Sequence, residues 1–160
     1  MIRLVNQVEV PFNAEQAWEC FRRMDEHYHE WVPEHLGWRW IRGEPLAEGT
    51  TWHADEWVGP MRIDALFRVS EVGPGRRFAY RILGFPAGLV RSGGSFECAP
   101  LSSGHCELRH EVHVGFRFPL LGSILDAAIR VVVPVDELRR HMREEGDAFA
   151  ELVQRASHAT

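Results

Sequence analysis

The segment VDELRRHMREEGDAFAELVQR, residues 135–155, decides the fold of this chain, because it is long enough for one helix of about six turns. At about 100° per residue its apolar side chains fall on a single stripe, and its charged side chains cover the other side. The stripe consists of Leu138, Met142, Phe149, Leu152 and Val153. A helix with one apolar face buries that face against another layer, so the sequence predicts a C-terminal helix that covers a sheet.

Two polar residues, His141 and Glu145, interrupt the apolar stripe at a spacing of i, i+4. A carboxylate in this position loses its hydration, and an unpaired buried charge costs several kcal/mol. It therefore needs a cation, an arginine, a hydrogen-bond partner or a raised pKa. The pattern H-x-x-x-E allows one helix to supply two metal ligands, and a hydrogen-bonded pair at the rim of a pocket is the alternative.

Further candidate ligands lie upstream. Glu56 alternates with Trp52, Ala54 and Val58, which places it on the inner face of a strand. The segment HYHEWVPEH, residues 27–35, adds three histidines at a junction between helix and strand, namely His27, His29 and His35. Two histidines and two carboxylates form a tetrahedral zinc site, or an open one if a carboxylate yields to substrate.

The rest of the chain is predicted as a strand, two short helices and a run of strands. Residues 2–10 alternate as a strand that Pro11 ends, Asn13 caps a helix through Phe21, and Asp25–Trp31 forms a second short helix. The later strands are expected at Trp38–Arg42, Thr50–Val58, Met61–Val72, Arg77–Leu83, Val90–Ala99 and His105–Phe116. Their alternation is typical of an antiparallel sheet with one buried face.

Two segments between these elements carry predictions of their own. Gly93-Gly94 inside a strand indicates a bulge or bend. Leu120–Val133 is apolar on nearly all sides and predicts a buried helix, which Pro134 kinks or restarts.

The inner face of the predicted sheet also carries candidate catalytic and binding residues. His110 is a candidate for polarising a substrate, and Tyr80 for donating a hydrogen bond, although both residue types are commonly packed core residues. The candidates for ligand contacts are Trp52, Phe67 and Phe78 on the predicted sheet, and Leu138 and Met142 on the predicted C-terminal helix.

Composition excludes several classes of protein. The 160 residues predict a single domain over 1–160, with 45% hydrophobic and 26% charged residues. The net charge is −5 and all 18 basic residues are arginine, which argues against nucleic-acid or membrane partners, Schiff-base chemistry and a Walker phosphate loop. Three cysteines without a C-x-x-C spacing, and no apparent signal peptide or membrane span, favour a cytoplasmic protein.

The segments VEVPFNAEQAWECF (8–21), GTTWHADEW (49–57) and VGPGRRFAYRI (72–82), in this order, resemble the START-like superfamily, also called SRPBCC. The resemblance covers essentially the whole chain and is closest to polyketide-cyclase-type members. It implies an α+β helix-grip fold, in which a curved antiparallel sheet wraps around the long C-terminal helix and two short helices follow the first strand. An apolar cavity is expected between sheet and helix.

Within that superfamily HYHEWVPEH (27–35), ADEW (54–57) and HMREEG (141–146) are similar to the zinc-dependent diacetylphloroglucinol hydrolase group. Those enzymes cleave a carbon–carbon bond between an acyl group and a phenolic ring. The resemblance implies a zinc ion held by His35, Glu56, His141 and Glu145, with His35 preferred over His27 and His29.

The function expected from these observations is a metal-dependent hydrolase acting on an aromatic or polyketide-like ketone. Two alternatives remain open: a carrier of a hydrophobic ligand or lipid, and a metal-free polyketide cyclase or dehydratase. The expected partner is a small hydrophobic or aromatic molecule, and the protein is expected to be a monomer or a homodimer.

Overall fold

The computed structural model describes residues 1–73, 76–84, 90–101, 104–116, 127 and 133–158. The elements in chain order are β1 (Ile2–Val10), α1 (Ala14–Arg22), α2 (Met24–Trp31), β2 (His35–Arg42), β3 (Thr51–Val58), β4 (Met61–Gly73), β5 (Arg77–Leu83), β6 (Val90–Pro100), β7 (Cys106–Phe116) and α4 (Val135–His158). This order confirms the predicted α+β helix-grip fold.

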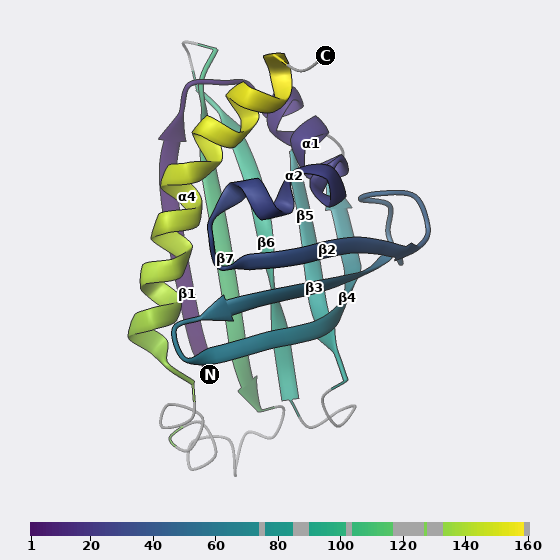
Figure 1. The fold of residues 1–160 in the computed structure, drawn as a ribbon, viewed down its shortest axis with the longest axis vertical. Coiled ribbons are helices and arrows are strands. Elements are labelled where there is room, and N and C mark those ends of the chain that lie inside the picture. The colour runs from purple at the N-terminus through teal and green to yellow at the C-terminus, as the bar shows by residue number, and fades with distance from the viewer. Residues whose placement is uncertain (74–75, 85–89, 102–103, 117–126, 128–132, 159–160) are drawn as a thin grey trace.

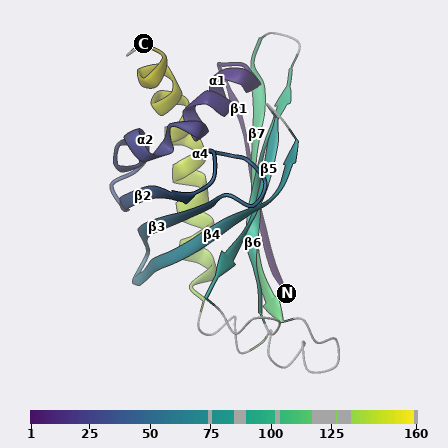
Figure 2. The same ribbon diagram turned by 90° about the vertical axis from the view of Figure 1, so that its right-hand side faces the viewer.

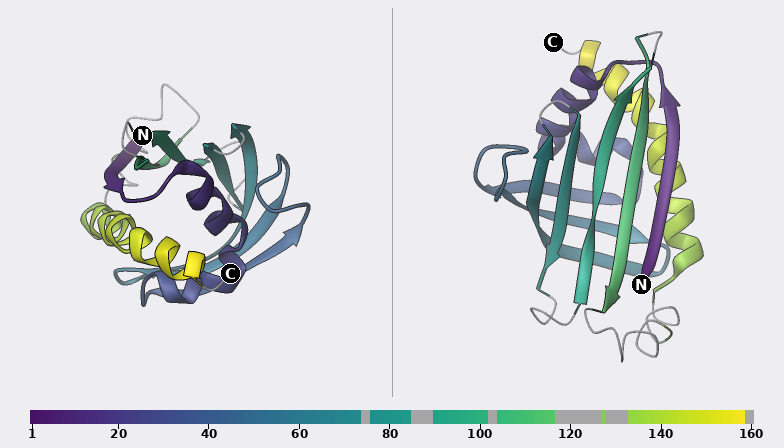
Figure 3. Two further views of the ribbon diagram at one scale, coloured as in Figure 1. Left: turned by 90° about the horizontal axis from the view of Figure 1, so that it is seen from above. Right: turned by 180° about the vertical axis from the view of Figure 1, so that it is seen from behind.

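The strands form one antiparallel sheet of seven, in the order β1-β7-β6-β5-β4-β3-β2. The sheet is strongly curved: β2 and β3 run across the view of Figure 1, whereas β1, β6 and β7 run along it. Seen from the side, α4 lies on the concave side of the sheet, and α1 and α2 lie on the same side (Figure 2). The view from above shows the sheet curving around these helices (Figure 3).

Helix α1 begins at a side-chain cap. Asn13 caps α1 by accepting a hydrogen bond from the backbone N–H of Gln16, whose side chain accepts from the backbone N–H of Asn13 in return. This reciprocal capping box satisfies two backbone donors that a helix start leaves open. The inward face of α1 buries Phe21, which stacks on Phe149 of α4 at 4.7 Å between ring centroids.

Helix α4 buries the predicted apolar stripe. Leu138, Met142, Phe149, Leu152 and Val153 are all buried, and each such side chain contributes about 1.5–3 kcal/mol before entropy is counted. The helix also approaches β1 closely, since Asn6 Nδ2 donates a hydrogen bond to the carbonyl of Met142 at 2.9 Å. Gly146 permits this approach, because a side chain there would collide with the Asn6 amide.

Two details differ from the sequence predictions. Strand β2 begins at His35 rather than at Trp38, because His35 pairs with Glu56 of β3 before a register shift at Gly37. Gly93 and Gly94 form no bulge, since both pair in continuous register with β5 and β7. Gly94 is required for a different reason: a Cβ there would collide with the carbonyl of Glu111 and the ring of Tyr80.

Three further predictions concern the cysteines, a membrane span and the apolar segment before the last helix. Cys20, Cys98 and Cys106 are buried free thiols, as expected for a chain without a disulfide scaffold. In the part of the chain that the structure describes, no helix is long and apolar enough to cross a membrane. The apolar segment Leu120–Val133 lies outside the described residues, apart from Ala127 and Val133.

Candidate metal centre

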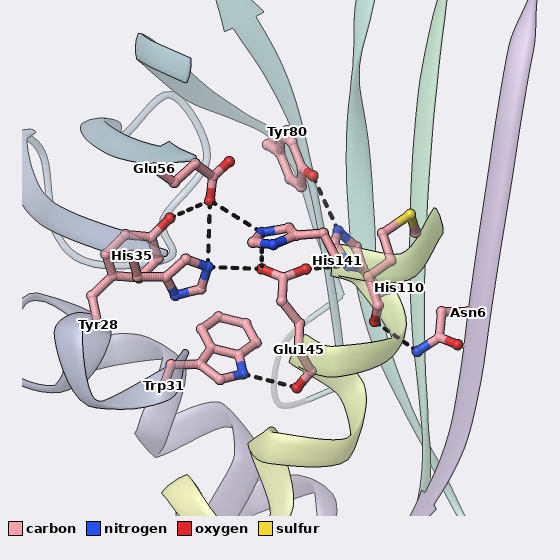
Figure 4. Close-up of polar contacts among 10 residues, drawn as sticks. Asn6, Tyr28, Trp31, His35, Glu56, Tyr80, His110, His141 and Glu145 are labelled. Atoms are coloured by element: carbon pink, nitrogen blue, oxygen red, sulfur yellow. Dashed lines mark hydrogen bonds and ion pairs between the residues drawn. The ribbon is translucent and has the colours of Figure 1, made fainter. Parts of the chain in front are cut away.

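Four residues from three elements converge beneath the concave face of the sheet. His35 and Glu56 are direct partners across the β2–β3 ladder, and His141 and Glu145 come from one face of α4. Each can offer one ligand atom such that all four atoms lie within 4.8 Å of one another. Figure 4 shows these side chains pointing toward one another. The structure therefore brings together the four residues that were predicted as metal ligands.

The two carboxylates lie between the two imidazoles. His35 Nε2 is 3.1 Å from Glu145 Oε1 and 3.4 Å from Glu56 Oε2. His141 Nε2 is 3.8 Å from Glu145 Oε1 and 3.9 Å from Glu56 Oε2. In a tetrahedral site with metal–ligand bonds of about 2.1 Å, the ligand atoms lie about 3.4 Å from one another. All four distances in this cluster are near that value.

The side chains of this cluster are buried, so burial and the neighbouring charges shift their pKa values. His35, His141 and Glu145 are 2%, 5% and 6% exposed. Burial raises the pKa of the Glu145 carboxyl, but its contacts with the rings of His110 and His35 outweigh burial and hold the pKa well below its usual range. Glu145 is therefore a carboxylate at neutral pH, which is the form that binds a metal.

The pKa of His141 is shifted in the opposite direction to that of Glu145. Burial lowers the pKa of His141, but its interaction with Glu56 and the negative charges of Glu145, Glu56 and Glu34 outweigh burial and raise the pKa to about 9. Without a metal, this imidazole therefore holds a proton that compensates the carboxylates. Its Nε2 nevertheless has no hydrogen-bond partner among the described residues. A buried, unsatisfied nitrogen between two carboxylates is well suited to a divalent cation.

Two aromatic residues of α2 position the ligands, and the sequence analysis did not single them out for this role. Tyr28 donates a hydrogen bond from Oη to Glu56 Oε2 at 2.5 Å and stacks on the ring of His35 at 3.9 Å. Trp31 donates from Nε1 to the backbone carbonyl of Glu145 at 2.8 Å. Burial, and then the charge of Glu56, raise the pKa of Tyr28 well above its usual value, so it remains a hydrogen-bond donor.

The two predicted catalytic residues extend the cluster. His110 Nδ1 is 3.4 Å from Glu145 Oε2, and His110 Nε2 is 3.3 Å from the hydroxyl of Tyr80. Burial, and then the charges of Glu145 and Glu56, raise the pKa of Tyr80, which keeps its hydroxyl protonated. If His110 carries its proton on Nδ1, that proton faces the Glu145 carboxylate and Nε2 accepts a hydrogen bond from Tyr80. Tyr80, His110 and Glu145 thus form a continuous polar chain (Figure 4).

A cavity of about 90 Å³ adjoins this chain, between the sheet and α4. Tyr80, His110 and Glu145 line it, as do four of the five predicted contact residues, Trp52, Phe67, Leu138 and Met142. Phe78 is not among the lining residues of this cavity, and its role as a ligand contact stays a prediction. Its ring is buried between Phe21 and Phe96 in the core, with centroids at 5.2 and 5.4 Å. Strand alternation gives the correct face for Phe78 but not its position along the sheet.

The structure also separates the three histidines of the segment 27–35. His35 joins the cluster because it pairs with Glu56 on the neighbouring strand. His29 is exposed and lies 3.8 Å from Glu30. His27 is half-buried on α2 and belongs to no group of potential metal ligands among the described residues.

Comparison with known proteins relates nearly all of the chain to one family. Residues 1–154 match the family described as polyketide cyclase/dehydrase and lipid transport. No curated protein matches the chain.

Among solved structures, a START superfamily protein from Mycobacterium smegmatis has a TM-score of 0.69 at 15% identity, over 96% of this chain and 98% of that one. The Zhui aromatase/cyclase from Streptomyces sp. R1128 has a TM-score of 0.69 at 16% identity, over 96% and 94%. Norcoclaurine synthase from Thalictrum flavum, in complex with dopamine and hydroxybenzaldehyde, has a TM-score of 0.65 at 13% identity, over 96% and 87%. At such low identity these likenesses establish the fold.

Proposed function

The chain belongs to the polyketide cyclase/dehydrase and lipid transport family, and we propose that it is a zinc-dependent hydrolase that cleaves a carbon–carbon bond beside the ketone of an aromatic or polyketide-like molecule. The observation that carries this proposal is the convergence of His35, Glu56, His141 and Glu145 within 4.8 Å. The aromatic ligands of the Thalictrum flavum structure support the class of substrate, because they show that this fold accommodates aromatic molecules.

The donor set fits zinc better than magnesium or calcium. Two imidazole nitrogens and two carboxylate oxygens form a common zinc set, whereas magnesium and calcium prefer ligand sets made of oxygen alone. Zinc held by these four residues would supply Lewis-acid polarisation of a ketone oxygen. Tyr28 and Trp31 would keep the ligands oriented, as outer hydrogen bonds do at metal sites.

The remaining groups of the site supply the proton that the released carbon takes up. Hydrolysis of a carbon–carbon bond beside a ketone adds the hydroxyl of water to the acyl carbon and a proton to the carbon that is released. Tyr80 and His110 both line the cavity and share a hydrogen bond, so together they hold a proton at its wall. Glu145 Oε2 lies 3.4 Å from His110 Nδ1, on the side of the ring away from Tyr80. This geometry favours Tyr80 and His110 as the acid that delivers the proton to the released carbon.

The size of the cavity sets a condition on substrate entry. About 90 Å³ is smaller than the cavity of about 150 Å³ known to hold a benzene ring. A ring-bearing substrate therefore requires the lining side chains to move apart. Leu138 and Met142 of α4 line the cavity opposite the sheet, so movement of this helix or its side chains would enlarge it.

Elemental analysis of the purified protein tests the proposal. We expect one zinc per chain, lost in both His141→Ala and Glu145→Ala. His105→Ala is the matched control, because His105 is half-buried at the surface and pairs with Glu9 at 3.1 Å. The zinc-loaded protein should release a carboxylic acid from an acylated phenol. Protein that folds and contains no zinc after growth and dialysis in zinc-containing buffer contradicts the proposal.

A second function, a metal-free cyclase or dehydratase, is favoured by one specific observation. The contacts from Tyr80 through His110 to Glu145 involve no metal, and they bring together an acid and a carboxylate. The family description includes both activities. This function predicts that the zinc-free protein remains active and that Tyr80→Phe abolishes activity. A ligand carrier, in contrast, would retain a hydrophobic molecule and leave it unchanged.

A further inference from the structure

Three tryptophans at or next to the cavity have indole nitrogens for which the described residues supply no hydrogen-bond acceptor. The Nε1 atoms of Trp38, Trp40 and Trp52 are all buried, and none has a partner among the described residues. Leaving a buried N–H donor unpaired costs about as much as a lost hydrogen bond, so proteins rarely do so without a reason. The other tryptophan at the cavity, Trp31, does have its acceptor, the carbonyl of Glu145.

Two of these three indoles belong to the cavity wall. Trp38 and Trp52 both line the cavity, and Trp52 is 2% exposed. Trp52 is held between flat neighbours: its ring stacks on Trp38 at 4.9 Å and on Phe67 at 5.1 Å, with interplanar angles of 16° and 10°. Stacking on both faces fixes the plane of the indole. The Nε1 atoms of Trp38 and Trp52 are closed to solvent, so an oxygen reaches them only when the lining side chains move apart, as entry of a ring-bearing ligand already requires.

The strand register places these indoles at a defined separation from the metal ligands. On β3, Trp52 precedes Glu56 by four residues on the same face, and Ala54, the partner of Trp38, lies between them. At about 3.3 Å per residue, the backbone positions that carry the two indoles lie about 7 Å (Trp38) and about 13 Å (Trp52) along the strand direction from that of Glu56. An aromatic ring with oxygen atoms on opposite sides is about as long as the shorter of these distances.

We infer that Trp38 and Trp52 form a second polar anchor of the cavity, which receives a hydrogen-bond-accepting oxygen at the end of the ligand remote from the metal ligands. The assignment of the near end rests on the proposed function. The ligand class is then an aryl ketone that carries a second oxygen across the ring from its acyl group. Such a ligand would satisfy at its far end the indole donors that the protein leaves open.

The competing explanation is that ring faces satisfy these donors. Trp52 makes edge contacts with Trp40 at 5.8 Å and with Tyr80 at 5.7 Å, and an N–H directed at an aromatic face is weakly stabilised. In that case the indoles would not distinguish an oxygen from a methyl group. Two probes of nearly the same shape separate the explanations: para-hydroxyacetophenone and para-methylacetophenone differ only in the group at the far end.

Calorimetric titration with both probes, on protein whose zinc content has been measured, tests the inference. One added neutral hydrogen bond predicts that the hydroxy probe binds about fivefold to tenfold more tightly. Trp52→Phe and Trp38→Phe keep an aromatic ring but lose the N–H, so each should reduce this preference toward unity. Trp57→Phe is the control, because Trp57 is 40% exposed and lies outside the cavity lining. In proton–nitrogen correlation spectra, the indole signals of Trp38 and Trp52 should shift with the hydroxy probe and much less with the methyl probe.

Equal affinities for the two probes, or binding of neither, overturns the inference. The zinc content of the same samples keeps this result separate from the proposed function. A zinc-loaded protein without probe discrimination contradicts only the indole anchor, whereas a zinc-free protein that discriminates supports the anchor and contradicts the metal-dependent hydrolase.

Discussion

Replacement of Glu145 by glutamine is the sharpest perturbation of the proposed centre. Glu145→Gln keeps the size of the side chain and its place on α4, but it removes the negative charge that lies 3.1 Å from His35 and 3.8 Å from His141. Because the carboxylate is 6% exposed, water cannot compensate for the lost charge. We expect the variant to fold and to bind zinc weakly.

The magnitude follows from the number of ligands. Four-ligand structural zinc sites bind with about 10 to 16 kcal/mol, so the share of one charged ligand is about 3 kcal/mol. This corresponds to a dissociation constant about one hundredfold larger. A second effect is independent of zinc: the pKa of His141, which is about 9 partly because of Glu145, should fall in the variant.

Zinc affinity is measured by competition with a chromogenic chelator, and the His141 titration by nuclear magnetic resonance of the zinc-free protein. Glu144→Gln is the matched control, since Glu144 is the residue before Glu145, its carboxylate is exposed, and its Oε1 lies 3.7 Å from Arg140 Nη1. It should leave both measurements unchanged. A zinc affinity of Glu145→Gln within about threefold of the wild type would refute the assignment of Glu145 as a ligand.

Four further predictions follow from the contacts of the site and of the sheet. The apparent zinc affinity should increase up to about tenfold per pH unit as the pH rises toward 9, because His141, with its pKa of about 9, must lose a proton to bind; a zinc titration from pH 6 to 9 that shows no slope contradicts this. In the zinc-free protein the same raised pKa has the opposite consequence: its stabilising contribution is complete below the ordinary histidine value and disappears as the pH rises through about 9, which urea unfolding at several pH values will measure. Tyr28→Phe removes the hydrogen bond to Glu56 and should weaken zinc binding about tenfold to one hundredfold while the stacked ring is kept, as read from the chelator competition. Gly94→Ala should destabilise the fold by more than about 2 kcal/mol through collision with Tyr80, whereas Gly37→Ala, with open space around it, should change unfolding by less than about 1 kcal/mol.

Local periodicity was enough to predict much of the fold and part of the site. The alternation in Met61–Val72 and the stripe from Leu138 to Val153 identified the buried faces, because strands and helices repeat every two and every 3.6 residues whatever surrounds them. The same rule exposed His141 and Glu145 as polar residues inside an apolar stripe. For Tyr28 a usable signal existed, since it is four residues after Met24 and three before Trp31, both buried in α2, but this pattern indicates a packed residue and not its partner.

The sequence by itself determined which faces are buried, that a helix offers an H-x-x-x-E pair, and that Glu56 points inward. Only the tertiary structure decided that His35 rather than His27 or His29 meets them, that Phe78 lies in the core beyond the cavity, and that three indole donors lack acceptors among the described residues. The physical reason is range: the direction of a side chain is set by its own backbone, whereas its neighbours are set by the register of β2 against β3 and by the position of α4 across a sheet whose curvature depends on the whole chain.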